Sequence, residues 1–165
     1  YGPAFELMEN RPVNPGKEEY FNSEKYEIKD WNFDQKNYLY KFISRLNRIR
    51  NENKALQNTH SIKFHQIDNE ALICYSKVTD DLSNIILVVV NLDPHHTHSG
   101  WMHIPLKHFE IEPHTSYQLQ DLVSGSHFLW NGEFDYVELD PGVMPVHIFK
   151  IRRKVRSERD FDYFM

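Results

Sequence analysis

Ile85-Ile86-Leu87-Val88-Val89-Val90 is the longest apolar stretch of the sequence, and it decides the fold. A strand built from this stretch would present apolar side chains on both faces, as a buried central strand does. The stretch is far too short to cross a bilayer. We therefore predict that residues 85–92 form a central strand of a sheet.

The sequence from Thr59 onward shows the two-residue period of β-strands on both sides of this stretch. A loop at residues 79–84 should join the central strand to the strand before it, and Asn131-Gly132 is a hairpin signal. Many short strands at close spacing are typical of an antiparallel β-sandwich, which we predict for residues 59–155. The expected strands are residues 61–67, 71–78, 85–92, 98–104, 116–122, 126–130, 134–139 and 146–152.

Residues 35–53 show the helical period instead. Five apolar side chains at spacings of three and four share one face of this predicted amphipathic helix. They are Leu39, Phe42, Ile43, Leu46 and Ile49. Asp34 is a favourable N-cap residue for the helix.

Residues 1–34 are irregular, because prolines and glycines such as Pro12 and Pro15 interrupt regular pairing. A segment of this kind has no core of its own and needs another surface to lie on. The chain also begins at Tyr1 rather than at a methionine. We therefore interpret it as a fragment of a larger protein.

Composition allows one domain with a core, since the chain has 165 residues, of which 40% are hydrophobic. Nineteen basic and 24 acidic residues give a net charge of −5, with no polybasic run beside an apolar span. This balance argues against nucleic-acid and membrane partners. The single cysteine, Cys74, cannot form an internal disulfide, and no secretory signal is seen, which together fit a reducing compartment. We expect Cys74 to be a buried, inert thiol.

One cluster of candidate metal ligands lies directly after the central strand. Asp93, His95, His96, His98 and His103 fall within eleven residues. Zinc accepts such ligands, but a closed site needs three or four that converge, and no cysteine lies nearby. We interpret the cluster as a polar loop. The sequence also lacks a glycine-rich phosphate loop and a nucleophile elbow, so we expect no metal, no cofactor and no complete catalytic set.

Several segments resemble one enzyme family. They are Tyr-Gly-Pro-Ala-Phe-Glu-Leu at 1–7, Pro-Gly-Lys-Glu-Glu-Tyr at 15–20, Ser-Glu-Lys-Tyr at 23–26, Arg-Leu-Asn-Arg-Ile-Arg at 45–50, Asn-Leu-Asp-Pro-His at 91–95, Tyr-Val-Glu-Leu-Asp-Pro-Gly at 136–142 and Pro-Val-His-Ile-Phe at 145–149. Together they resemble the C-terminal third of the α-1,4-glucan:maltose-1-phosphate maltosyltransferases, which belong to the α-amylase superfamily. The resemblance covers nearly the whole chain.

The resemblance implies a division of the chain into three parts. Residues 1–58 would be the end of a catalytic (β/α)8 barrel, with its last strand, an active-site loop and the closing helix. Residues 59–155 would be the all-β C-terminal domain. The tail at 156–165 matches no family motif.

The resemblance also implies where the chemistry lies. The family's catalytic carboxylates come from earlier barrel strands, so the chain alone should be non-catalytic. Lys25 and Tyr26 match the pair that contacts the donor maltosyl unit. Their loop, residues 16–27, offers amine and phenol groups that suit hydrogen bonds to sugar hydroxyls.

The expected function is therefore that of the intact enzyme. It would transfer maltosyl units from α-maltose 1-phosphate to α-1,4-glucan in the cytoplasm, without a cofactor. The partners would be these two substrates and the missing barrel, for which the apolar helix face is made. In the chain alone, the sandwich, residues 1–34 or a second copy in a homodimer would cover that face instead.

Two other functions stay open. The chain could be a glucan-binding β-sandwich module, or the C-terminal domain of another α-amylase-family hydrolase. Aromatic residues make up 14% of the chain, and aromatics both fill cores and form platforms for sugar rings. A binding module should show Trp101 and Trp130 on a flat, open face, whereas a supporting domain should bury them.

Overall fold

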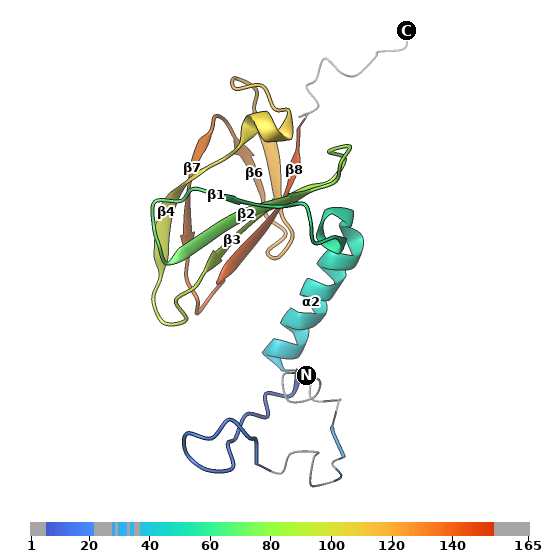
Figure 1. The fold of residues 1–165 in the computed structure, drawn as a ribbon, viewed down its shortest axis with the longest axis vertical. Coiled ribbons are helices and arrows are strands. Elements are labelled where there is room, and N and C mark those ends of the chain that lie inside the picture. The colour runs from blue at the N-terminus through green and yellow to red at the C-terminus, as the bar shows by residue number, and fades with distance from the viewer. Residues whose placement is uncertain (1–5, 22–27, 29, 33, 35–36, 154–165) are drawn as a thin grey trace. The chain divides into compact units, whose positions relative to one another are not determined.

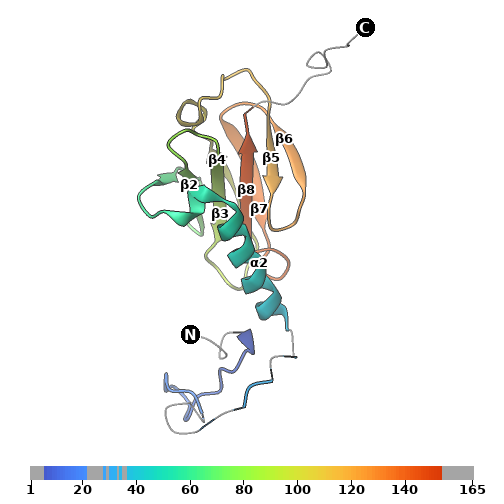
Figure 2. The same cartoon turned by 90° about the vertical axis from the view of Figure 1, so that its right-hand side faces the viewer.

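The computed structural model describes residues 6–21, 28, 30–32, 34 and 37–153. The chain divides into two compact units, residues 1–49 and 50–165. Figures 1 and 2 show all the strands in the second unit. No helix in the described part of the chain is long and apolar enough to span a membrane.

Residues 6–21 are irregular, as the sequence predicts, with one isolated antiparallel bridge between Pro12 and Tyr20. The Phe21 N–H donates to the Arg11 carbonyl at 2.7 Å, and the Arg11 guanidinium lies 4.8 Å from the Phe21 ring centroid. Gly16 turns the chain between them with φ of +79°, a conformation that favours glycine. The segment is thus a small loop held by local contacts.

The predicted helix is present as α2, Tyr38–Glu52. The Asn37 side chain accepts a hydrogen bond from the Tyr40 N–H at 2.9 Å, so Asn37 caps the helix and the prediction of Asp34 as N-cap is wrong. Asn37 directly precedes the first helical turn, where an amide oxygen reaches an unpaired N–H. Ile49 is buried, and the other four residues of the predicted apolar face are half-buried.

The described residues of the second unit, 50–153, form eight antiparallel strands in two sheets, each strand lying where the sequence predicts one. The six-stranded sheet has the order β1-β2-β3-β8-β5-β6, and β4 pairs with β7 in a two-stranded sheet. Two 3-10 helices, Lys54–Gln57 and Leu106–Phe109, accompany them. The strands are β1 Ile62–His65, β2 Leu72–Val78, β3 Ile85–Asn91, β4 His98–His103, β5 Tyr117–Asp121, β6 His127–Trp130, β7 Phe134–Leu139 and β8 Val146–Arg152.

Strand β3 is the centre of the larger sheet, between β2 and β8. Residues 85–89 are all buried, so the strand is covered on both faces as its composition predicts. The core of the domain gathers buried residues from both sheets, among them Leu87 and Val89 of β3, Met102 of β4 and Leu139 of β7. The two sheets therefore share one apolar core, as in a β-sandwich.

The hairpin predicted at Asn131-Gly132 is wrong. Gly132 has φ of +91°, so a turn is present, but β6 pairs with β5 and β7 pairs with β4. The turn carries the chain from one sheet to the other, and the Tyr117 hydroxyl donates to the Gly132 carbonyl at 2.9 Å. The predicted hairpin at residues 79–84 is confirmed by the antiparallel register of β2 with β3.

Candidate functional site

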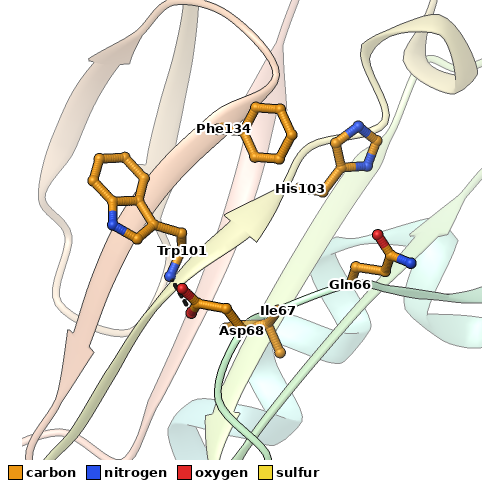
Figure 3. Close-up of a pocket in the computed structure, with 6 residues that line it drawn as sticks. All are labelled: Gln66, Ile67, Asp68, Trp101, His103 and Phe134. Carbon is orange, nitrogen blue, oxygen red and sulfur yellow. Dashed lines mark hydrogen bonds between the residues drawn. The ribbon is translucent and has the colours of Figure 1, made fainter.

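The two site residues taken from the family resemblance, Lys25 and Tyr26, lie outside the described residues. Their role stays a prediction. The candidate site in the described part of the chain is instead a surface pocket of about 460 Å³ on the outer face of the β4–β7 sheet. Its lining residues, shown in Figure 3, are Gln66, Ile67, Asp68, Trp101, His103 and Phe134.

Strand alternation places the aromatic side chains of this pocket on one face. Trp101 is opposite Tyr136, and His103 is opposite Phe134, in the register of β4 with β7. Their neighbours Met102 and Val137 point into the core, so the aromatic residues point outward. The ring centroids lie 5.5 Å apart in the Trp101–Tyr136 pair and 5.1 Å apart in the His103–Phe134 pair.

Residues 66–68 extend the same face on the other side of β4. Ile67 forms an isolated antiparallel bridge with Met102, which places Gln66 beside His103 and Asp68 beside Trp101. The His103 N–H donates to the Gln66 carbonyl at 2.9 Å, and the Trp101 N–H donates to Asp68 Oδ1 at 2.7 Å. We call the outward side chains Gln66, Asp68, Trp101, His103, Phe134 and Tyr136 the aromatic face.

Gly100 lets residues 66–68 approach β4 closely. A Cβ atom at position 100 would lie 2.7 Å from Asp68 Oδ1, closer than real Cβ contacts allow. Any side chain there would push the carboxylate away from the Trp101 N–H. The glycine therefore fixes the polar edge of the aromatic face.

The exposure of Trp101 and Trp130, which should distinguish a binding module from a supporting domain, differs between the two residues. Trp101 is 54% exposed, whereas Trp130 is half-buried, with its ring centroid 5.2 Å from that of the buried Phe149. Trp130 therefore supports the core, and Trp101 lies on an open face. Exposure therefore gives Trp130 a structural role and leaves the Trp101 ring accessible to a ligand.

The histidine-rich loop after β3 is held together by Asp93. Its Oδ2 lies 2.8 Å from His96 Nδ1 and 3.1 Å from His98 Nε2, and its Oδ1 accepts the His95 N–H. These contacts lower the pKa of Asp93 well below its usual range, the largest cause being the bond from the His95 backbone. The described residues hold no group of three or more side chains suited to a metal ion.

Asp121, Ser124 and His147 have the residue types of a hydrolase triad but not its order. Ser124 Oγ donates to Asp121 Oδ2 at 2.6 Å, and His147 Nδ1 lies 3.0 Å from the same oxygen. A triad needs the serine bonded to the histidine and the histidine to the carboxylate. Here the carboxylate stands between the other two, so the arrangement is structural.

Cys74 is also structural, because it is buried and burial raises the pKa of its thiol to about 12.

His65 is a titratable group whose environment opposes protonation at mildly acid pH. It is half-buried on β1, with Nε2 2.8 Å from Ser76 Oγ and its ring against the buried Phe109. Its pKa is lowered to about 4, with burial as the largest cause and smaller contributions from Lys63, His108 and His103. The folded protein therefore holds His65 neutral.

We expect this histidine to make the fold acid-sensitive. The unfolded chain takes up a proton at His65 below about pH 6.5, whereas the folded chain does so only near pH 4. The contribution of His65 is thus fully present above pH 6.5 and is lost as the pH drops toward 4, by about 2 kcal/mol once its partial exposure to solvent is allowed for. Denaturant midpoints between pH 7.5 and 4.5 measure the loss. His65→Gln should remove most of this loss of stability, since glutamine does not titrate. The control His114→Gln, at an exposed histidine, should retain the loss. An equal change of the denaturant midpoint with pH in the two variants would contradict the assignment to His65.

Comparison with known proteins identifies a family and a related fold. A family model described as GLGE, C-terminal, matches residues 64–151. An α-1,4-glucan:maltose-1-phosphate maltosyltransferase of Chlorobaculum tepidum is 48% identical over 92% of this chain and 23% of its own length. One from Methylacidiphilum infernorum is 42% identical over 92% of this chain and 22% of its own. The chain thus spans about a quarter of the length of these relatives.

A solved structure, a maltogenic α-amylase of Thermotoga neapolitana, is similar in fold. The TM-score is 0.53 at 13% sequence identity, and the match covers 70% of this chain and 26% of the amylase. At this identity the likeness concerns the fold alone. An all-β domain of this kind therefore also occurs in an α-amylase.

Proposed function

We propose that this chain, which belongs to the GLGE C-terminal family, is the non-catalytic C-terminal part of an α-1,4-glucan:maltose-1-phosphate maltosyltransferase. The whole enzyme would transfer maltosyl units from α-maltose 1-phosphate to α-1,4-glucan. The observation that carries the proposal is the 48% identity to a protein of that name over 92% of the chain. The alternative parent, another α-amylase-family hydrolase, has only a likeness of fold at 13% identity in its favour.

In this proposal the β-sandwich supports a barrel that carries the chemistry. Residues 1–58 would be the end of that barrel, residues 59–155 the supporting domain and residues 156–165 a tail. Residues 6–21 are irregular, and the apolar face of the amphipathic helix α2 is only half-buried over most of its length. Both features support the proposal that this part of the chain lies on the surface of another domain. A second copy of the chain is the other candidate for that surface, and light scattering would detect it.

A cytoplasmic location belongs to the same proposal. Cys74 is the only cysteine of the chain and is buried as a free thiol. Disulfides are rare in reducing compartments, and a chain without a disulfide pair fits one. Fractionation of cells that express the whole enzyme would test the location.

The proposal predicts a functional role for Lys25. In the whole enzyme, Lys25→Ala should lower kcat/KM for maltose 1-phosphate by about 10- to 100-fold, because a charged hydrogen bond to a sugar oxygen contributes roughly 1.5–3 kcal/mol. Tyr26→Phe should have a smaller effect, since it removes a neutral hydrogen bond. Phosphate release with glycogen as acceptor measures the rate.

Lys17→Ala is the matched control for this experiment. Lys17 is an exposed lysine in the same irregular segment, at the Gly16 turn. Its removal should leave both the rate and the thermal midpoint unchanged, because isolated surface charges contribute little. The role of Lys25 would be rejected if Lys25→Ala left kcat/KM for maltose 1-phosphate unchanged. It would also be rejected if the fall in kcat/KM were explained by a fall in the stability of the variant.

A further inference from the structure

We propose that the aromatic face on β4 and β7 is a binding site for a neutral α-1,4-glucan chain, separate from any site for the donor sugar phosphate. The choice of glucan as ligand rests on the proposed function. The existence of a carbohydrate site on this face rests on the geometry below.

The first support is an open arrangement of aromatic rings. Trp101, Tyr136 and Phe134 are 54%, 48% and 62% exposed, although each belongs to a strand whose other side faces the core. Aromatic side chains of this size normally contribute to stability by burial. Here two cross-strand rows, separated by two residues along β4, leave their rings in solvent. Consecutive apolar faces of sugar rings can lie against rings arranged in this way.

The second support is a polar edge directly beside the rings. Figure 3 shows Gln66 and Asp68 along one side of the pocket and Trp101 and Phe134 along the other. Asp68 Oδ1 accepts the Trp101 N–H, which fixes the carboxylate, while its second oxygen can accept from a hydroxyl. The Gln66 amide offers both donors and an acceptor. Apolar walls with a few polar groups that can hydrogen-bond are typical of small-ligand sites.

The third support is the sign of the charge. Of the described residues that line the pocket, none is a lysine or an arginine, and Asp68 carries a negative charge. Glu138 lies on the same side of β7, one row beyond Tyr136, and is exposed. These two carboxylates would repel the phosphate group of a ligand bound on the aromatic face. The face therefore suits a neutral glucan and disfavours maltose 1-phosphate.

Another exposed aromatic pair lies outside this pocket. Phe64 and Tyr75 lie opposite each other on β1 and β2 with ring centroids 6.0 Å apart, and Phe64 is 61% exposed. Neither residue lines the pocket at the aromatic face. Exposure of a ring is thus not enough by itself. The combination of rings, a concave surface and fixed polar groups is what singles out the aromatic face.

The test is a titration of the whole 165-residue chain with maltoheptaose, supported by electrophoresis in gels that contain glycogen. We expect the chain to bind maltoheptaose and to be retarded by glycogen, and to bind neither cellohexaose nor maltose 1-phosphate. Trp101→Ala should weaken binding about tenfold or more, whereas Trp101→Phe should keep most of it because a flat ring remains. Leu129→Ala is the matched control, since Leu129 is a 65% exposed apolar residue on β6.

Three results would overturn the inference. They are no binding of either glucan, an equal loss in Trp101→Ala and Leu129→Ala, or a dimer in light scattering that Trp101→Ala dissociates. The last result would mean that a second copy of the chain covers the face. Kinetics of the Lys25→Ala enzyme are independent of this titration, so failure of the proposed function and failure of the glucan site can be told apart.

Discussion

Asp121→Ala is expected to lower the free energy of unfolding by about 3–5 kcal/mol, because it removes the buried carboxylate that joins the turn after β5 to β8. The side chain is fully buried. Its two oxygens accept from the backbone N–H groups of Val123, Ser124 and Ile148, and also contact the Ser124 hydroxyl and the His147 ring. Truncation leaves these buried donors without partners, which costs more than the loss of the bonds alone.

Urea denaturation at pH 7 measures this loss, and Asp140→Ala is its control. Asp140 is an exposed aspartate after β7 that accepts the Gly142 N–H at 2.8 Å, so it makes a turn contact of the same kind at the surface. We expect a loss below about 1 kcal/mol there. Similar losses in the two variants would show that burial of the Asp121 network is not what stabilises the fold.

The pH dependence of the same network gives a second measurement. Burial raises the pKa of Asp121, but the hydrogen bonds from His147, Ser124 and Val123 outweigh burial and hold the pKa at about 2. Because the folded pKa is below the unfolded value near 4, the stabilisation is present above pH 4 and is lost as the pH falls toward 2. The loss amounts to about 2 kcal/mol. Asp121→Asn should abolish this part of the acid transition, whereas the part above pH 4 belongs to His65.

The positions of the strands could be predicted from the sequence because strand period is a local signal. The described strands other than β3 lie within residues that show the two-residue alternation, and β3 is central because its composition suits burial on two faces. The pairing of strands is not local. Asn131-Gly132 correctly indicates a turn, but the core places β6 and β7 in different sheets, which no dipeptide can encode.

The candidate site was less predictable for the same reason. Trp101 could be named from the sequence as a residue whose exposure matters. Gln66 and Asp68 could not, because they join the face only through the bridge between Ile67 and Met102, some 35 residues apart. The close approach at Gly100 is the one signal in that region, since a glycine inside a strand often marks a second backbone nearby.

Phe109→Ala is expected to have an effect as large as that of Asp121→Ala, at a site where no hydrogen bond is lost. Phe109 is fully buried in the 3-10 helix between β4 and β5, within the core shared by the two sheets. Removing the ring should lower the free energy of unfolding by about 3–5 kcal/mol, through lost burial and the cavity left behind. Phe134→Ala is the matched control, since the same substitution at a 62% exposed ring should change stability by less than about 0.5 kcal/mol.

The Phe109 variant should also change the acid response of the domain. The Phe109 ring lies edge-on to His65, with centroids 6.3 Å apart, and is part of the surroundings that shield one side of His65 from water. A cavity beside His65 and His108 would have polar groups to hold water, so the pKa of His65 should rise from about 4 toward 6.5. Phe109→Ala should therefore be less stable at pH 7 yet lose less stability between pH 7 and 4.5 than the unmodified chain. Denaturation at both pH values measures the two effects, and a variant with an unchanged pH slope would show that Phe109 does not control the hydration of His65.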